Sequence, residues 1–351
     1  MIAEPNVEEE CQASEPPLSG KTPEAEEMLK APLAREHSSQ KHHYSLDRYG
    51  DSSATQISID NQSVSLAVEA AVAIVINGIH YAVLMASPNQ LEYLAVGFLF
   101  SEGLIQHSYE LLDWEVTQLT NISSYQQFAQ DSNDENIGTA TFEQLSQQLQ
   151  DYDIYVVELV LNQRSHQRIQ AQRRQLAGRT GCGMCGITGL TQALPDLSSY
   201  SQSSLSQNTI ATKHQHDSKK KSARPSLDYL LNMRQEVDAL QHTHQLTGAV
   251  HAAATMYNQQ LYLFEDVGRH NALDKLIGWQ LRQKTDVNCV LMTSRLSIEL
   301  VQKSIRGRIP WLIGMSAPTS TALRVAERYG LGLAGFLRHD RVTYYSGYSD
   351  S

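Results

Sequence analysis

NCVLMTSRLSIELVQKSIRGRIPWLIGMS, residues 288–316, carries the pattern that decides the fold. Its two ends, NCVLMTS and PWLIGMS, are short apolar runs typical of buried strands. The segment between them, SIELVQKSIRG, is amphipathic and favours a helix. A strand, a helix and a second strand in succession indicate a layered α/β domain, because each element must bury its apolar side against another.

The alternation continues on both sides of this segment. Downstream, TALRVAERYG favours a helix and leads into LAGFLRHDRVTYYS. Upstream, SLDYLLNMRQEVDALQ suits a helix, GAVHAAATMY and QLYLFED suit strands, and VGRHNALDKLIGWQLRQ suits another helix. Residues 226–351 are therefore expected to form a C-terminal α/β domain in which helices cover a sheet.

The N-terminal half shows a second folded unit, which begins with EAAVAIVINGIHYAVLM. Two β-rich runs flank Asn77-Gly78, a dipeptide typical of a tight hairpin turn. NQLEYLAVGFLFSEGLI follows with apolar residues at helical spacing and predicts a helix that ends at Gly103. The alternating run DIYVVELVLN predicts a further strand. Together these elements indicate a smaller α+β domain.

Segments of low complexity divide the chain. Residues 1–58 are rich in Glu, Ser, Pro and His, bury little apolar surface and are predicted to be disordered. A Gln-, Ser- and Asn-rich stretch at about 118–150 has the composition of a polar insert. We predict an N-terminal domain at 59–195, a low-complexity linker at 196–225 and the C-terminal domain at 226–351.

Charge and composition exclude some classes of function. The chain has 351 residues and a formal net charge of -10, with a pI near 5.7, which argues against non-specific nucleic-acid binding. We find neither a secretory signal nor an apolar run long enough to span a membrane, and we expect a soluble, cytoplasmic protein. The cysteines are too few for a disulfide scaffold and are expected to be thiols: Cys11, Cys182, Cys185 and Cys289.

GCGMCG, residues 181–186, holds two of these cysteines and is open to several interpretations. A zinc site needs two further ligands, and the sequence has no second cysteine pair. A redox dithiol normally begins a helix, whereas here the flanks RTG and GITGL are rich in Gly. A turn whose cysteines only pack is the structural alternative. The Gly-rich flanks favour an accessible loop suited to sulfur or acyl relay, with arginines nearby to stabilise a thiolate: Arg173, Arg174 and Arg179.

Two apparent motifs do not fit the chemistry they suggest. The C-terminal alternation resembles that of zinc deaminases, but Ala253 stands where a His-x-Glu signature starting at His251 needs its Glu. GLGLAG, residues 330–335, matches the dinucleotide fingerprint, but it follows a predicted helix and opens a strand. Pyrophosphate binding requires the reverse order. We therefore predict neither deamination nor a dinucleotide fingerprint at these positions.

Polar clusters follow several of the predicted strands. EDVGRHNALDK lies where a strand ends and a helix begins, TSRLSIE repeats that layout, and SAPTSTA and GFLRHDR are similar. Because open α/β sheets bind ligands at the carboxyl ends of their strands, we expect these loops to converge on a phosphate-bearing or heterocyclic ligand. A set of caps and salt bridges with Asp266 as N-cap is the structural alternative. The candidate ligand-binding residues are His251, Asp266, Arg269, His270, Arg295 and Ser297.

These motifs, in this order, resemble the FdhD proteins, the sulfur carrier proteins required for formate dehydrogenase. The resemblance rests on LAVGFLFSEGLI, CGMCG, TGAVHAAA, EDVGRHNALDKLIG, SRLSIELVQKSIRGRIPWLIGMSAPTSTAL and GLAGFLRHDRVTYYS, and it covers about residues 64–347 apart from the polar inserts. It implies a cytidine-deaminase-like three-layer α/β/α C-terminal domain without the zinc centre, plus a smaller α+β N-terminal domain. It also implies a homodimer and no structural metal.

The resemblance further implies a sulfurtransferase. Such a protein takes persulfide sulfur from a cysteine desulfurase and transfers it to the molybdenum cofactor, bis-molybdopterin guanine dinucleotide, before insertion into formate dehydrogenase. By position, Cys182 is similar to the persulfide-bearing cysteine and Cys185 to the second cysteine of the motif. The family's cofactor-binding segment matches Gly335, Phe336, Leu337, Arg338, His339 and Asp340.

Some residues depart from the family pattern, and two other functions stay open. Ser294 stands where the family often has Gly, and Trp311 and Met315 stand where it often has small residues. A chaperone that only holds the cofactor would need neither thiol. A thiol oxidoreductase would form a reversible disulfide between Cys182 and Cys185. Molybdenum and tungsten cofactors would look alike from these residues.

Overall fold

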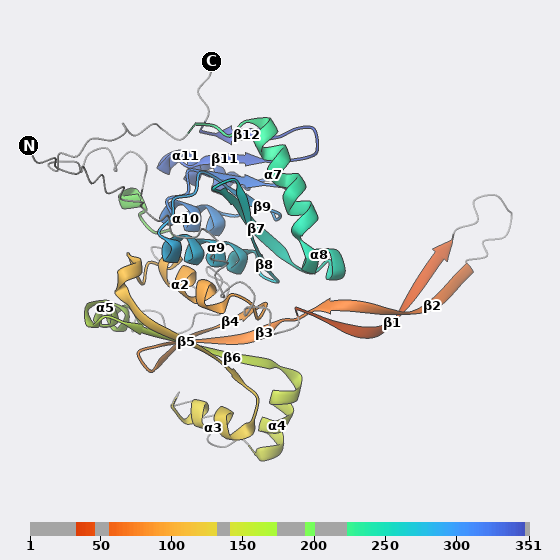
Figure 1. The fold of residues 1–351 in the computed structure, drawn as a ribbon, viewed down its shortest axis with the longest axis vertical. Helices are drawn as coiled ribbons and strands as arrows, with labels where there is room; N and C mark the ends of the chain where they lie inside the picture. The colour runs from red at the N-terminus through yellow and green to blue at the C-terminus, as the bar shows by residue number, and fades with distance from the viewer. Residues whose placement is uncertain (1–32, 46–55, 132–140, 174–193, 201–222, 348–351) are drawn as a thin grey trace, which may run out of the picture.

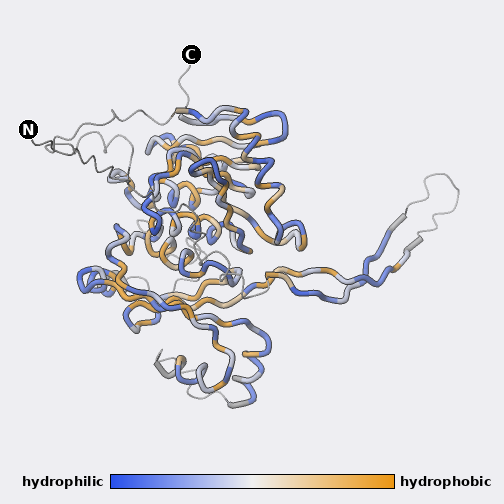
Figure 2. Tube along the Cα trace, in the orientation of Figure 1, coloured by the Kyte–Doolittle hydropathy of each residue, from blue (hydrophilic) through white to orange (hydrophobic). Residues whose placement is uncertain are grey.

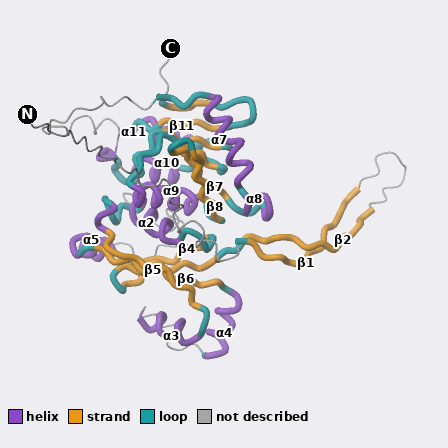
Figure 3. Tube along the Cα trace, viewed as in Figure 1, coloured by secondary structure: helices purple, strands orange, loops and turns teal. Residues whose placement is uncertain are grey.

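The structure is a computed structural model that describes residues 33–45, 56–131, 141–173, 194–200 and 223–347. These residues form a six-stranded sheet, a four-stranded sheet and a two-stranded ribbon (Figure 1). Helices lie between the two larger sheets and on their outer faces (Figure 3). Within these ranges, no helix combines the length and the apolar character that crossing a bilayer requires.

The C-terminal sheet has the strand order β12-β11-β10-β9-β7-β8. Its strands are β7 (His251–Tyr257), β8 (Gln260–Asp266), β9 (Val290–Met292), β10 (Trp311–Gly314), β11 (Gly332–Gly335) and β12 (Thr343–Ser346). β9, β10 and β11 are parallel, whereas β7, β8 and β12 run antiparallel to their neighbours. The strand, helix and strand predicted within residues 288–316 are confirmed as β9, α10 (Ile298–Arg306) and β10.

Helices cover both faces of this sheet. Besides α10 they are α7 (Leu227–Leu240), α8 (His242–Thr247), α9 (Arg269–Gln283) and α11 (Ser320–Tyr329). Val290 and Met292 of β9 pack in one core cluster with α9, α10 and α11, whereas Leu291 between them packs in another with α7. Because neighbouring side chains of a strand point to opposite faces, this alternation confirms the expected three-layer α/β/α arrangement.

The N-terminal sheet has the strand order β4-β3-β6-β5. Its strands are β3 (Ala70–Ile76), β4 (Ile79–Ala86), β5 (Leu111–Leu119) and β6 (Asp153–Leu161). Its helical segments are α2 (Leu91–Ser101), η1 (Ser108–Glu110), α3 (Ile122–Asp131), α4 (Phe142–Asp151) and α5 (Gln163–Arg173), and η2 (Ser198–Tyr200) follows later in the chain. The predicted hairpin is confirmed: Asn77 and Gly78 have φ angles of 49° and 75°, as a tight two-residue turn requires. The predicted helix is confirmed as α2, which ends at Ser101 rather than at Gly103.

The described parts of the polar stretch at 118–150 fold back onto the sheet. α3 and α4 lie on the face of the N-terminal sheet opposite α2, where Phe128 and Leu149 pack against Val75 and Val156 (Figure 1). A few apolar side chains at helical spacing are therefore enough to cover this face, although the composition of the stretch is polar.

The two larger sheets share one core. α2 of the N-terminal half packs against α9 of the C-terminal half, and a single cluster of buried side chains runs from β3 through both helices to β10. Gly97 of α2 and Gly278 of α9 face one another at the point of closest approach, where an added Cβ would meet the opposite backbone. Residues 201–222 of the linker predicted at 196–225 fall outside the described residues, and Leu197 at its start is buried in this shared core.

The two-stranded ribbon projects from the body (Figure 1) and carries mainly hydrophilic, exposed residues (Figure 2). It consists of β1 (Ala34–Ser45) and β2 (Gln56–Ala67). The predicted disorder is therefore wrong for residues 34–45 and 56–58, because an argument from burial overlooks the backbone ladder and cross-strand bonds such as that from Ser65 to Glu36, 2.6 Å. The predictions for 1–32 and 46–55 fall outside the described residues.

Candidate functional site at the carboxyl ends of the strands

The strand-end loops come together in the structure, whereas a ligand bound between them stays a prediction. The Met315 backbone N–H donates to the carbonyl of Met292, which joins the loop after β10 to the end of β9. The Phe336 N–H donates to the carbonyl of Ser316, which joins the loop after β11 to the loop after β10. At the other side, β7 begins at His251, which pairs in register with Asp266 at the end of β8. All of these loops therefore meet at one edge of the C-terminal sheet.

His251 lies among other basic groups at this edge. The Ala252 N–H donates to Oγ1 of Thr293, 2.9 Å, so that His251 sits beside the loop after β9. Burial lowers the pKa of His251, and the positive charges of Arg269, His244 and His270 lower it further. Such charge effects require groups that lie near one another. They are consistent with the prediction that His251, Arg269 and His270 share one site.

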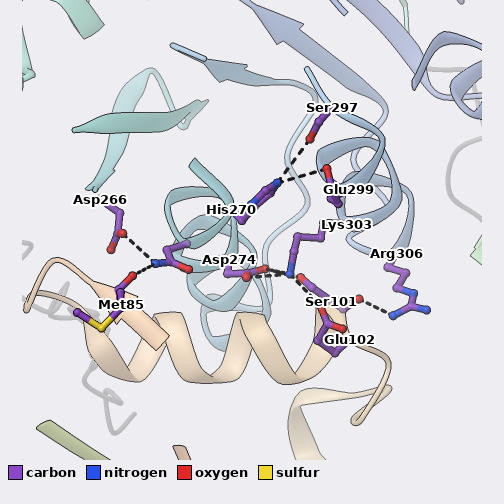
Figure 4. Close-up of polar contacts among 11 residues, drawn as sticks. Met85, Ser101, Glu102, Asp266, His270, Asp274, Ser297, Glu299, Lys303 and Arg306 are labelled. Carbon is purple, nitrogen blue, oxygen red and sulfur yellow. Dashed lines mark hydrogen bonds and ion pairs between the residues drawn. The ribbon is translucent and has the colours of Figure 1, made fainter. Parts of the chain in front are cut away.

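His270 contacts two residues at the start of α10 (Figure 4). Its Nε2 is 3.5 Å from Oγ of Ser297 and 3.6 Å from Oε2 of Glu299. The contact with His270 is the main cause that lowers the pKa of Glu299 to about 2, although partial burial of the carboxyl opposes the shift. Sequence analysis missed Glu299, whose only signal was its place two residues after Ser297 in the cluster TSRLSIE.

Two helix N-termini face the same edge. Gly268 is the N-cap of α9 and Ser297 is the N-cap of α10, and neither residue caps its helix through a side-chain hydrogen bond in the described structure. Free N–H groups at a helix start favour an anion such as a phosphate. Arg295 is exposed immediately before α10, where its guanidinium is available to the same ligand.

The segment 335–340 divides between the surface and the core. Gly335 lies so close to the carbonyl of Ser316 that an added Cβ would approach that oxygen to 2.8 Å. Phe336 is 40% exposed and has a φ of 51°, a left-handed conformation that is costly for a bulky side chain. His339 and Asp340 are also exposed. These residues can meet a ligand directly.

The remaining two residues of that segment hold it in place. Leu337 is fully buried against the α7 side of the sheet, and its carbonyl accepts a hydrogen bond from Arg234 of α7. Arg338 is partly buried, and its guanidinium donates to the carbonyl of Met315 and lies 6.0 Å from the centre of the Phe336 ring. Leu337 is therefore a packing residue rather than a ligand contact.

Asp266 differs from the other predicted ligand residues. Its carboxylate is completely buried and forms an ion pair with the equally buried Lys275, 2.7 Å apart. It also accepts from the Gly268 N–H, 2.8 Å, and from Nδ2 of Asn271, 3.0 Å. This is the structural alternative considered for the cluster EDVGRHNALDK, in which Asp266 organises the start of α9.

A second buried charge network lies along the same helices (Figure 4). Nζ of Lys303 in α10 is 2.9 Å from Oδ2 of Asp274 in α9 and 3.3 Å from Oε1 of Glu102 after α2. Ser101 donates to Oδ1 of Asp274, 2.6 Å. The network joins α9 and α10 of the C-terminal half to the end of α2, and no local sequence pattern indicates that these charges are buried.

The structure describes Cys289 but not the two cysteines of the GCGMCG motif. Cys182 and Cys185 lie outside the described residues. Cys289 is buried, and burial raises the pKa of its thiol to about 12, against a weaker effect of a hydrogen bond with Tyr229. Cys289 therefore supplies no thiolate near neutral pH. Among the described residues, His, Cys, Asp and Glu side chains form no group of three or more that would suit a metal ion.

Comparison with known proteins places the chain in a family. The model of the FdhD/NarQ family matches residues 67–350, far more than half of the chain. The chain belongs to the FdhD/NarQ family. The matched residues include the GCGMCG motif and every strand-end loop described above, so the sequence resemblance to FdhD proteins is confirmed.

Individual relatives agree with the family assignment. The chain is 34% identical over 286 residues to the "Sulfur carrier protein FdhD" of Shewanella oneidensis, an alignment that covers 80% of this chain and 84% of the relative. It is 37% identical over 285 residues to the protein of the same name from Chromobacterium violaceum, with 80% and 88% covered. The crystal structure of "a putative formate dehydrogenase accessory protein from Desulfotalea psychrophila" superposes with a TM-score of 0.54 and 18% identity, over 90% of this chain and 97% of that one, which supports the fold.

Proposed function

We propose that this FdhD/NarQ family member is a sulfurtransferase that carries sulfur as a persulfide on Cys182. It accepts the sulfur from a cysteine desulfurase and transfers it to the molybdenum cofactor, bis-molybdopterin guanine dinucleotide, before that cofactor is inserted into formate dehydrogenase. The observation that carries the proposal is the convergence of the strand-end loops in a chain whose relatives are named sulfur carrier proteins.

The edge has the chemistry that such a cargo needs. Its guanine dinucleotides carry phosphates, and Arg269, Arg295 and the N-termini of α9 and α10 can attract them. Exposed Phe336 offers a ring face on which a heterocycle can stack. Arg295 and Phe336 belong to two separate polar clusters of the sequence, TSRLSIE and GFLRHDR. The fold brings both clusters to the same edge of the sheet.

The sulfur step is a thiol exchange without net oxidation. The Cys182 thiolate attacks the outer sulfur of the desulfurase persulfide. A new S–S bond forms on Cys182, and the S–S bond of the donor persulfide breaks. The donor cysteine leaves as a thiolate, so that one sulfur atom moves and the charge is conserved. Arginines near Cys182 in the sequence, such as Arg179, favour the attacking thiolate. Transfer to the cofactor would break the S–S bond on Cys182, with Cys182 leaving as a thiolate, and the reduced cofactor would supply the two electrons that convert the outer sulfur to a sulfide.

The chain length permits Cys182 to serve the edge. Cys182 precedes Asp196 by fourteen residues (196 − 182 = 14), and Asp196 lies 3.5 Å from the hydroxyl of Tyr329 at the end of α11. Fourteen residues reach at most about 45 Å. The ten residues of α11 span about 15 Å from Tyr329 back to the strand-end edge. The fourteen residues between Cys182 and Asp196 are therefore long enough to span the length of α11 and reach the strand-end edge.

The proposal includes the cellular setting. We place the protein in the cytoplasm, where a reducing environment keeps Cys182 and Cys185 as thiols. A homodimer is part of the proposal on the strength of the family resemblance. Sedimentation of the purified full chain distinguishes a monomer from a dimer.

Intact-mass spectrometry tests the sulfur step. The protein is incubated with a cysteine desulfurase and cysteine, and a gain of about 32 Da marks one persulfide sulfur. We expect the gain in the wild type and in Cys289→Ala, the matched control for a buried thiol, and we expect Cys182→Ala to lose it. Cys185→Ala shows whether the second cysteine of the motif is needed. A Cys182→Ala protein that still supports formate dehydrogenase activity in cells would contradict the relay.

The same samples separate the two competing functions. A passive cofactor chaperone would show no mass gain and would retain cofactor binding after loss of both thiols. A thiol oxidoreductase would instead lose about 2 Da on oxidation as Cys182 and Cys185 form a disulfide with a defined reduction potential. Either result would replace the sulfur-carrier proposal.

A further inference from the structure

A fully buried lysine joins the two halves of the chain directly behind the candidate site. Nζ of Lys275 in α9 lies 2.7 Å from Oδ2 of Asp266 and 2.8 Å from Oδ1 of Asn89. It also lies 3.2 Å from the carbonyl oxygens of Ser87 and of Glu265. Ser87 and Asn89 belong to the connection between β4 and α2, whereas Glu265 and Asp266 end β8. One ammonium group therefore holds the two segments together.

The other residues of this contact complete the attachment. Asp266 accepts from the Ser87 N–H, 3.1 Å, in addition to its bonds with Lys275, Gly268 and Asn271. Asn271 donates to the carbonyl of Met85 at the end of β4, 2.8 Å, and the Val267 N–H donates to Oγ of Ser87, 3.1 Å. A carboxylate has about four acceptor positions, so these bonds occupy Asp266 fully. Asp266 thus acts inside the protein and leaves ligand contact to its neighbours.

Stability alone is a weak reason for burying this pair. Burial lowers the pKa of Lys275, and the Asp266 carboxylate opposes that shift. Replacing a buried ion pair by well-packed apolar residues is often neutral or stabilising, whereas the pair fixes a specific geometry. What it fixes here is the turn between β8 and α9, because Asp266 and Asn271 stand on the two sides of Arg269 and His270.

We propose that Asp266, Asn271 and Lys275 form a clamp that positions Arg269 and His270 at the ligand-binding edge by holding the turn between β8 and α9 against the connection between β4 and α2. The identity of the ligand rests on the proposed function, whereas the positioning does not. Through the clamp, the N-terminal half helps to position the binding residues, although it does not itself contact the ligand. A shift of the turn moves His270 relative to Ser297 and Glu299, its partners on α10.

The chain offers a matched control in the second buried network. Asp266→Asn with Lys275→Met removes the clamp's ion pair without leaving a lone buried charge. Asp274→Asn with Lys303→Met removes a second buried pair, one helical turn beyond His270 in α9, whose partners Ser101 and Glu102 lie at the end of α2 rather than in the connection between β4 and α2. Urea unfolding measures the free energy of unfolding of both double variants. A loss of stability alone can then be distinguished from a displacement of His270. Asn271→Ala is a milder clamp variant that leaves the ion pair in place.

The decisive measurement is independent of any ligand. In protein with 13C-labelled histidine, the ring signal of His270 is assigned by its disappearance in His270→Gln. We expect this signal to move in the clamp variant and in Asn271→Ala, and to stay in place in the Asp274/Lys303 control. A signal that stays in place in the clamp variants, or that moves equally in the control, overturns the proposal.

Binding of guanosine diphosphate, measured by calorimetry, then connects positioning with function. We expect the clamp variant to bind about tenfold more weakly, because small displacements of a binding group have large effects, and the control to change by less than about twofold. Equal losses in the two double variants contradict the clamp. A wild type that does not bind this probe, together with a His270 signal that moves only in the clamp variants, supports the clamp and refutes the cofactor-binding part of the proposed function.

Discussion

The close approach of α2 and α9 predicts that Gly278→Ala destabilises the whole chain. A Cβ at Gly278 would lie 2.0 Å from the carbonyl oxygen of Tyr93, whereas ordinary contact begins at 3.4 Å. The two helices would have to separate locally by about 1.4 Å (3.4 − 2.0), since the obstacle is backbone and cannot rotate away. Overpacking costs about 1–3 kcal/mol, or more at rigid sites. We take about 4 kcal/mol here and subtract about 1 kcal/mol for the better helix propensity of Ala.

The expected net loss is therefore about 3 kcal/mol in the free energy of unfolding. Urea unfolding followed by tryptophan fluorescence measures it, because Trp279 lies next to the substituted residue. Gly330→Ala is the control: it has a φ of +77° with no atom within 4 Å of an added Cβ, so it costs only the left-handed strain of about 1 kcal/mol. A Gly278→Ala protein that loses no more than Gly330→Ala would refute the reasoning.

Two further predictions each concern a single interaction. Because the pKa of Glu299 falls from 4.5 to about 2 on folding, its stabilisation is present above pH 4.5 and disappears as the pH falls through about 2. Urea unfolding should show Glu299→Gln less stable than wild type by about 1–2 kcal/mol at pH 7, after allowance for solvent, and equal to it near pH 2. Arg282, whose guanidinium lies 3.5 Å from the centre of the Trp114 ring, should contribute about 1 kcal/mol in a double-mutant cycle with Trp114. A coupling energy near zero would contradict that contact.

Local signals predicted most of the regular structure. Asn77-Gly78 specifies its turn through backbone preferences alone, and the apolar runs that became β9 and β10 are decided by their own residues. The convergence of the strand-end loops followed from the topology of parallel strands, which needs no knowledge of individual contacts. These predictions succeeded because they depend on residues that are close together in the chain.

Contacts between distant residues could not be predicted in this way. Lys275 and Lys303 read as surface charges, since lysine is seldom fully buried, and their acceptors on Asn89 and Glu102 are far away in the sequence. Gly97 gives the same local signal whether it faces solvent or another backbone. Glu299 was missed because its partner His270 lies on a different helix. The prediction of disorder at 34–45 failed because its pairing partner begins after residue 55.

The continuous core between α2 and α9 makes the two sheets respond together to a ligand. Whatever binds at the strand ends of the six-stranded sheet stabilises the native state of the entire core, because a ligand that binds only the folded form shifts the global unfolding equilibrium. Hydrogen exchange should then slow at amides of the buried strands β3 and β6, which we expect to exchange through global opening, although the ligand touches neither strand. A ligand bound to the C-terminal sheet thus slows amide exchange in the N-terminal sheet.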